Sequence, residues 1–351
     1  MLALLTGLWA GLARLGWDVP LPRPGFSSLH GPLMVSGFLG TLISLERAVA
    51  LGRPWAYAAP LLTGLGGVSL IVGAPLLVAQ WLMLAGSLVL VAIFAAIIRR
   101  HPALYTFTMG GGSLVWALGN LLWCLGWPVF LVVFWWAAFL VVTIAGERLE
   151  LARLQQVTGA AQATFLLLLG ILLTGLLLLG WSFDGGVRLF GLGLAGLALW
   201  LGRHDIARRT VKQAGLTRFI AICLLTGYVW LGISGLSAMW FGGVPVGPQY
   251  DATLHAFFLG FVFAMIFAHA PIIFPAVLGA RMAYRPLFYA HVVLLQVTLV
   301  VRLIGDAAGW SAGRQVGGLL NAVTLLLFLV NTVSALQSPP ERAGTAQGRG
   351  A

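Results

Sequence analysis

Long apolar segments separated by short polar turns are the feature that most restricts how this chain can fold. One of them, LHAFFLGFVFAMIFAHAPIIFPAVLG (residues 254–279), contains no Asp, Glu, Lys or Arg. A helix needs about 20 mostly apolar residues to span a bilayer, and about twelve such segments follow one another here. Only 8% of the residues are charged, against about 25% in a soluble globular protein. The sequence therefore predicts an all-α, polytopic integral membrane protein.

The predicted helices form a single transmembrane domain, residues 1–336, followed by a short tail. Residues 337–351 (QSPPERAGTAQGRGA) are rich in Gly, Pro and Ala, so we expect a disordered cytoplasmic tail. The longest polar stretch between helices, residues 203–216, is too short to fold alone. The expected spans are 2–17, 28–50, 55–74, 76–98, 104–124, 126–146, 161–181, 186–202, 217–241, 252–279, 285–305 and 314–336.

The net charge of +11 is distributed as a topology signal. With twelve spans and a cytoplasmic N-terminus, fifteen of the 20 Lys and Arg residues fall on the cytoplasmic side. Cytoplasmic loops of membrane proteins carry such an excess, so both termini are expected in the cytoplasm and no nucleic-acid partner is expected. Cys124 and Cys223 lie in apolar spans, and we expect neither a disulfide nor a metal motif from them.

A Glu-Arg pair recurs at the same end of two predicted helices. The stretch SLERAVALGRP contains Glu46-Arg47, and AGERLELARL contains Glu147-Arg148. These helices are four spans apart, and spans 2 and 10 both open with a histidine, which suggests three pseudo-repeats of four helices. For the Glu-Arg pairs, an interfacial ion pair and a role in a proton or substrate pathway are both open.

Four histidines lie within predicted spans, where ionisable side chains are rare and are treated as functional candidates. In span 10, the fourteen residues from His255 to His269 correspond to about 21 Å along the helix but only about 40° around it. The topology places His30 at the depth of His255, near the outer end, and His291 at the depth of His269, near the inner end. The histidines therefore form two depth-matched pairs.

Paired imidazoles at one depth on different helices are typical of a bis-histidine haem site in an apolar slot. We expect one haem b at the outer pair, and a second haem at the inner pair is an open alternative. Haem propionates need cations near the membrane surfaces. The candidates are Arg302 and Arg23 on the outer side and Arg281 and Arg285 on the inner side.

Two other roles for the outer histidines are open. A buried neutral histidine can hydrogen-bond across helices and serve only in packing. Met34 lies four residues after His30 on the same helix face, and a thioether with imidazoles suits copper. A copper site formed by His30, His255 and Met34 is therefore an alternative.

A different class of function, a cofactor-free proton-coupled transporter, is also open. Buried histidines together with Glu46 and Glu147 would line its pathway. Such transporters have helices broken near the middle of the bilayer. Pro271 and Pro275, or the run Gly110–Gly112, would mark those breaks.

Around His30 and His255 the sequence resembles the NnrS family, twelve-helix bacterial membrane proteins that carry haem and copper and are linked to the nitric oxide response. The family pattern His-x-His-Glu-Met-x-x-Gly-Phe corresponds to residues 30–38 (HGPLMVSGF), where Pro-Leu replaces His-Glu. The family motifs Leu-His-Ala and Arg-Pro-Leu correspond to residues 254–256 and 285–287. The resemblance implies a multi-pass protein of the bacterial inner membrane with nitric oxide or a redox protein as partner. Enzymatic activity and oligomeric state are left open.

More distantly, the chain resembles subunit I of the haem-copper oxidases. That fold has twelve helices in three pseudo-repeats, and histidines from its second and tenth helices hold a low-spin haem; His30 and His255 fall on the corresponding helices. Spans 6 and 7 (126–181) contain no histidine, so the oxidase copper cage cannot be built and oxygen reduction is not expected. The two resemblances together imply a haem protein of the gas response or of membrane electron transfer.

Overall fold

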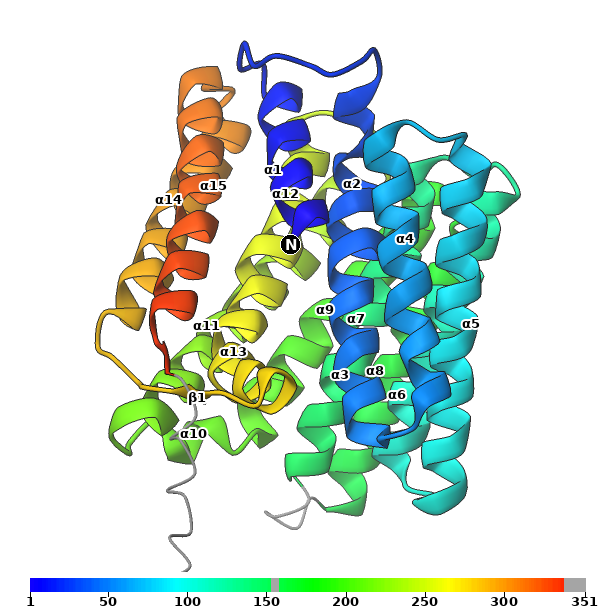
Figure 1. Cartoon of the computed structure of the whole chain (residues 1–351), viewed down its shortest axis with the longest axis vertical. Coiled ribbons are helices and arrows are strands. Elements are labelled where there is room, and N and C mark those ends of the chain that lie inside the picture. The colour runs from blue at the N-terminus through cyan, green and yellow to red at the C-terminus, as the bar shows by residue number, and fades with distance from the viewer. Residues whose placement is uncertain (153–157, 338–351) are drawn as a thin grey trace, which may run out of the picture.

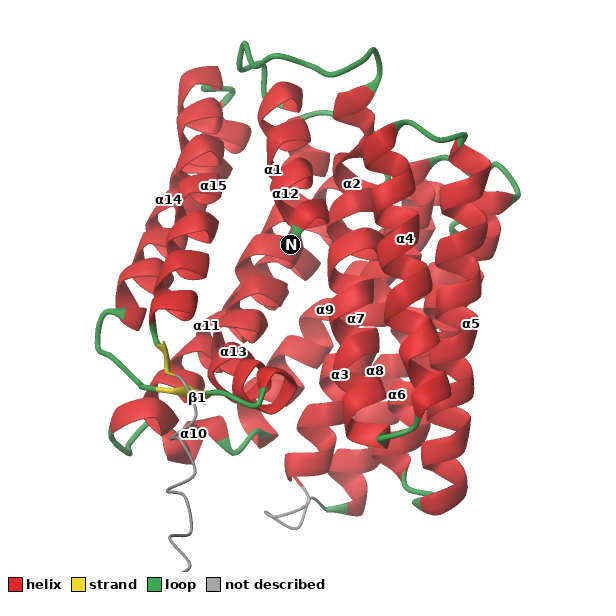
Figure 2. Cartoon of the chain, in the orientation of Figure 1, coloured by secondary structure: helices red, strands yellow, loops and turns green. Residues whose placement is uncertain are grey.

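The protein is a bundle of long helices, as seen in the computed structural model, which describes residues 1–152 and 158–337 (Figures 1 and 2). Among these residues, ten helices are long and apolar enough to cross a membrane. The predicted all-α, polytopic membrane fold is therefore confirmed. The predicted tail, residues 337–351, lies outside the described residues except for Gln337.

Helical segments occupy all twelve predicted spans, but two of them differ from the other ten. Helix α1 is only 13 residues long, and α6 carries Thr, Gly, Trp and Asn side chains that make it less apolar than the rest. The helices are α1 (Leu2–Arg14), η1 (Phe26–Leu29), α2 (His30–Pro32), η2 (Leu33–Gly40), α3 (Thr41–Leu51), η3 (Pro54–Tyr57), α4 (Ala58–Val72), α5 (Leu76–Arg100), α6 (Leu104–Cys124), α7 (Val129–Ala152), α8 (Gly159–Leu178), α9 (Phe183–His204), α10 (Ala207–Thr210), α11 (Gly215–Phe241), α12 (Pro248–His255), η5 (Ala256–Val262), α13 (Phe263–Leu278), α14 (Phe288–Ala308) and α15 (Ser311–Ser334).

Consecutive helices pack side by side through most of the bundle. Helices α4 to α7 follow one another, α8, α9 and α11 form a second group, and α14 packs against α15. Two short strands, β1 (Arg281–Met282) and β2 (Leu336–Gln337), pair antiparallel and join the segment before α14 to the end of α15. The arrangement into three repeats of four helices stays a prediction.

Helix α7 is the most deeply buried of the candidate membrane spans, with 83% of its membrane-length window inside the protein. Residues 129–146 of this helix carry no charged side chain, as expected for a helix surrounded by others. A buried amide next to it is hydrogen-bonded at both ends, because Trp136 Nε1 donates to Asn120 Oδ1 (3.0 Å) and Asn120 Nδ2 donates to the carbonyl of Met83 (3.3 Å). Unpaired, such a polar group would cost about 1–3 kcal/mol.

The bundle has two ends, which we call the upper and lower faces after their orientation in Figure 1. The upper face contains the turns 15–25 and 242–247, and the lower face contains α10, β1 and the turn after α3. Both helices that carry the outer histidines change to π-helical geometry close to the histidine, at Leu33–Gly40 and at Ala256–Val262. Such segments are rare and are frequently found at functional sites.

Candidate functional site

The structure brings His30 and His255 together in the upper half of the bundle, on α2 and α12 (Figure 1). Their ring centroids are 6.1 Å apart, and the ring planes are inclined by only 19°. Parallel rings stacked face to face would be about 3.5–4 Å apart. The two imidazoles are therefore not in direct face-to-face contact, and the centroid distance is compatible with an offset stack or with two rings on either side of one metal ion.

Backbone carbonyls fix the tautomer of both rings. His30 Nδ1 lies 2.7 Å from the carbonyl oxygen of Gly7, and His255 Nδ1 lies 2.9 Å from that of Asp251. Because a carbonyl oxygen can only accept, each Nδ1 carries a hydrogen, and in the neutral form of each ring Nε2 is then the nitrogen with the lone pair. Neither Nε2 has a hydrogen bond within the described residues. Histidines that bind metals are oriented in the same way by a hydrogen bond from their other nitrogen.

These dimensions fit two imidazole nitrogens bound to one metal ion. Two nitrogen–metal bonds of about 2 Å each account for about 4 Å of the 6.1 Å between the ring centroids. The remaining distance of about 2 Å is the sum of the two distances from a ring centre to its metal-binding nitrogen. A cavity of about 380 Å³ adjoins both rings, and Leu39, Phe258 and Phe263 are among the apolar residues that line it. Its volume lies within the usual range for a small-molecule or cofactor site. The residues present therefore fit a bis-histidine haem.

Two carboxylates and two arginines form a network next to this cavity. Arg302 donates to Asp251 through both Nε (2.9 Å) and Nη2 (3.0 Å). Asp251 also lies 3.3 Å from His255 Nδ1 and 3.9 Å from Arg314, whose Nε is 3.0 Å from Asp306 Oδ1. Arg302, predicted as a propionate partner, is thus bound by a carboxylate of the chain itself.

The other predicted propionate partners are Arg23 for the outer side and Arg281 and Arg285 for the inner side. Arg23 donates to the carbonyl of Leu70, and Arg285 is exposed in the segment before α14 at the lower end. The side chain of Arg281 lies outside the described residues, although its backbone belongs to β1. Arg14, at the end of α1, does line the upper cavity. Arg14 has no carboxylate partner within the described residues, so it is the cation placed to meet an acidic group there.

Glycines of α1 make room for the residues of α2 and η2. A Cβ atom at Gly11 would lie 2.9 Å from both Cε1 and Nδ1 of His30, and one at Gly7 would lie 2.7 Å from Met34 Sδ. The sulfur of Met34 thus packs against α1, while its side chain also lines the cavity. No group of three or more His, Cys, Asp and Glu side chains within the described residues could hold a metal ion. A copper site would therefore depend on Met34 and the two imidazoles alone.

The inner histidines lie in different surroundings. His269 donates from Nδ1 to the carbonyl of Met265 (2.7 Å) and lines a second cavity of about 70 Å³ with Glu46 and Glu147. His291 is 2% exposed and packs among aromatic rings, and its Nε2 is buried without a hydrogen-bond partner. In the described part of the chain no ring contact joins the two imidazoles. The rings around His291 are those of Phe219, Phe267, Phe288 and Phe328.

The two Glu-Arg pairs meet each other in the lower half of the bundle. Arg47 Nη2 donates to Glu147 and lies 3.3 Å from Glu46. This contact joins residues 100 positions apart in the sequence. The first Glu-Arg pair is therefore bound to the second, and both carboxylates face the second cavity.

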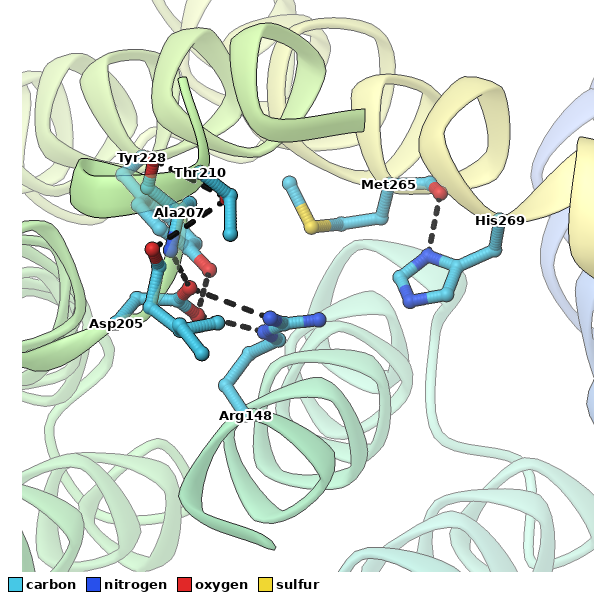
Figure 3. Close-up of polar contacts among 8 residues, drawn as sticks. Arg148, Asp205, Ala207, Thr210, Tyr228, Met265 and His269 are labelled. Carbon is cyan, nitrogen blue, oxygen red and sulfur yellow. Dashed lines mark hydrogen bonds and ion pairs between the residues drawn. The ribbon is translucent and has the colours of Figure 1, made fainter. Parts of the chain in front are cut away.

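Arg148 forms a separate buried ion pair, shown in Figure 3. Its Nε and Nη2 atoms donate to the carboxylate of Asp205 at 2.6 and 3.2 Å. Asp205 also accepts from the hydroxyl of Tyr228 (2.7 Å) and from the backbone N–H of Ala207 (2.7 Å). The free end of the Arg148 guanidinium points toward His269. The arrangement satisfies the carboxylate completely, as expected for a charge out of contact with water.

Several residues of the upper site were not selected from the sequence. Asp251 precedes His255 by four residues in PQYDATLH, a spacing that puts both side chains on one helix face. That spacing was the available signal. The contacts of Arg314 and Asp306 join different helices, and no sequence pattern indicates them.

Comparisons with known proteins yield one match. A family model described as a domain of unknown function (DUF8744) matches residues 1–337. No curated protein matches the chain, and no solved structure matches it.

Proposed function

The chain belongs to the DUF8744 family, and since that description names no activity, we propose from its site that it is a membrane haem protein that transfers electrons. One haem b would be held between His30 and His255. The supporting observation is the pair of nearly parallel imidazoles at a centroid distance of 6.1 Å, each with Nδ1 on a backbone carbonyl. When bound, the haem supplies a centre that carries one electron.

Electron transfer is favoured over nitric oxide or other gas binding because neither histidine is held more weakly than the other. A diatomic gas needs an open or displaceable axial position. Gly7 orients His30 at 2.7 Å and Asp251 orients His255 at 2.9 Å, so both rings are held by comparable hydrogen bonds. Neither ring can swing away from its position without breaking its hydrogen bond to the backbone. We therefore assign the chain to electron exchange with a redox partner.

The proposed location is the bacterial inner membrane, with the lower face in the cytoplasm. Basic residues gather at helix ends and turns of the lower face, among them Arg99, Arg100, Arg208 and Arg209. Cytoplasmic loops carry this excess of positive charge. The histidine pair would then lie nearer the outer side of the membrane.

The transporter alternative has less support. Pro271 and Pro275 lie within α13, and Gly110–Gly112 lies within α6, so the predicted helix breaks are absent at these positions. The second cavity, with His269 and Glu147, is the feature that favours this alternative. Its volume of about 70 Å³ is enough for a few water molecules, but it is much smaller than the cavity at the upper histidines.

The visible spectrum of the full-length protein tests the proposal. Protein purified in detergent from haem-replete cells is expected to contain about one haem b per chain, with the bands of a six-coordinate low-spin iron. Carbon monoxide should leave the reduced spectrum unchanged, since both axial positions are taken. A preparation without a Soret band would refute haem binding, whereas a carbon monoxide shift would support gas binding instead.

A bulky residue at Gly11 should disturb the proposed haem site without replacing either histidine. In Gly11→Val, the new side chain would collide with the His30 ring, because even a Cβ there lies 2.9 Å from it. We expect haem content to fall by roughly tenfold, the scale of effects seen when a ligand's support is removed. The measurement is the ratio of Soret to protein absorbance. Gly111→Val is the matched control, since nothing lies within 4 Å of that position, and an equal loss there would contradict the explanation.

A further inference from the structure

Asp306, near the end of α14, is a buried carboxylate with unusually poor hydrogen bonding. Its side chain is 1% exposed, and neither carboxylate oxygen has a hydrogen-bond partner within the described residues. Arg314 Nε lies 3.0 Å from Oδ1, but this nitrogen is also without a hydrogen bond, so the two groups are close and misaligned. A buried anion without hydrogen bonds is costly.

The neighbouring carboxylate, Asp251, is in the opposite situation. It receives both donors of the Arg302 fork and lies 3.3 Å from His255 Nδ1. The charged groups gathered here come from four elements: Asp251 from α12, Arg302 from α14, Arg314 from α15, and Arg14 of α1 at the rim of the same cavity. Of the two carboxylates, Asp306 is the one whose charged form is less stabilised.

We propose that Asp306 is a redox-linked proton site: it takes up one proton when the haem is reduced and releases it when the haem is oxidised. This inference rests on the proposed haem function. An electron from a one-electron reductant lowers the net charge of the site by one, and charge changes interact strongly where water is excluded. Protonation of the Asp306 carboxylate restores the balance, so that one electron and one proton enter together. Asp251 remains an anion because Arg302 holds it.

The test is the midpoint potential of the haem-loaded, full-length protein measured by spectroelectrochemical titration from about pH 5 to pH 9. The reduced state binds the proton more tightly, so the potential should fall as pH rises. One electron with one proton gives a limiting slope of about 59 mV per pH unit, because each unit is a tenfold change in proton concentration. In Asp306→Asn the potential should become independent of pH.

Two control variants make the result specific. Asp184→Asn removes an exposed upper-face carboxylate paired with Arg188 and should keep the wild-type slope. Asp306→Glu keeps a carboxylate, so its potential should keep the wild-type slope over a shifted pH range. This variant also tests the proton site if Asp306→Asn fails to bind haem. A flat wild-type potential, or a slope that persists in Asp306→Asn, would overturn the proton site while leaving the haem in place. Absence of haem from the wild-type protein would instead overturn the proposed function.

Discussion

Either His30→Ala or His255→Ala is expected to lower the haem content of the purified protein more than tenfold. Loss of a group that only supports a metal ligand already costs about 10–100-fold in affinity, and here the ligand itself is lost. The remaining histidine keeps its backbone hydrogen bond but has no partner across the gap. The measurement is the haem-to-protein ratio by the pyridine haemochrome method at equal expression.

Substitutions at the other histidines provide the comparison. His101→Ala, at an exposed position, should retain full haem content. His269→Ala and His291→Ala should also retain it, because these rings lie in separate surroundings. A loss of half the haem in either inner variant would reveal a second haem and contradict the proposal of a single site.

The second large effect is expected for Asp205→Ala, in the lower half of the bundle. This substitution leaves the guanidinium of Arg148, whose side chain is 4% exposed, without its bidentate partner. Breaking a buried ion pair by removing one member costs about 3–5 kcal/mol. The thermal unfolding midpoint in detergent should therefore fall by many degrees, or the protein should fail to accumulate.

Two further substitutions test whether loss of the buried ion pair causes the destabilisation: one breaks an exposed ion pair, and the other removes a single hydrogen bond to Asp205. Asp184→Ala breaks the pair with Arg188, whose side chains are 61% and 47% exposed, and exposed pairs contribute little. Its unfolding midpoint should be unchanged. Tyr228→Phe removes only one hydrogen bond to Asp205 and should have a smaller effect than Asp205→Ala. Equal effects of the buried and exposed variants would contradict the assignment.

The helical fold could be predicted because the bilayer imposes one length and one polarity on every span. Residues 217–241, for example, were expected as a span, and α11 covers Gly215–Phe241. The π-helical segments after His30 and His255 could not be predicted, since the apolar pattern is the same for either kind of helix. The end of the first helix could not be predicted for a similar reason. The mostly apolar sequence continues to residue 17, where the span was expected to end, but the helix ends at Arg14.

The candidate site was only partly predictable, because topology gives the depth of a residue but not the direction in which it faces. Depth was sufficient to predict that His30 and His255 lie close together. Depth also paired His269 with His291, yet the first ring faces a small cavity and the second is enclosed by phenylalanines. Arg302 lines the cavity near which a cation was expected, but the carboxylate that binds it, Asp251, comes from another helix.

The hydrogen bonds that orient the two imidazoles bear on how the protein is made. His30 is held by Gly7, only 23 residues earlier in the chain, and His255 by Asp251 in the preceding helical turn. Each half of the site can thus acquire its tautomer and direction as soon as its own segment enters the membrane. The halves are synthesised 225 residues apart, so the first must wait, already oriented, through the insertion of most of the bundle. Capture of the proposed haem would then be a late event in biogenesis, in which two segments that are already oriented pack together.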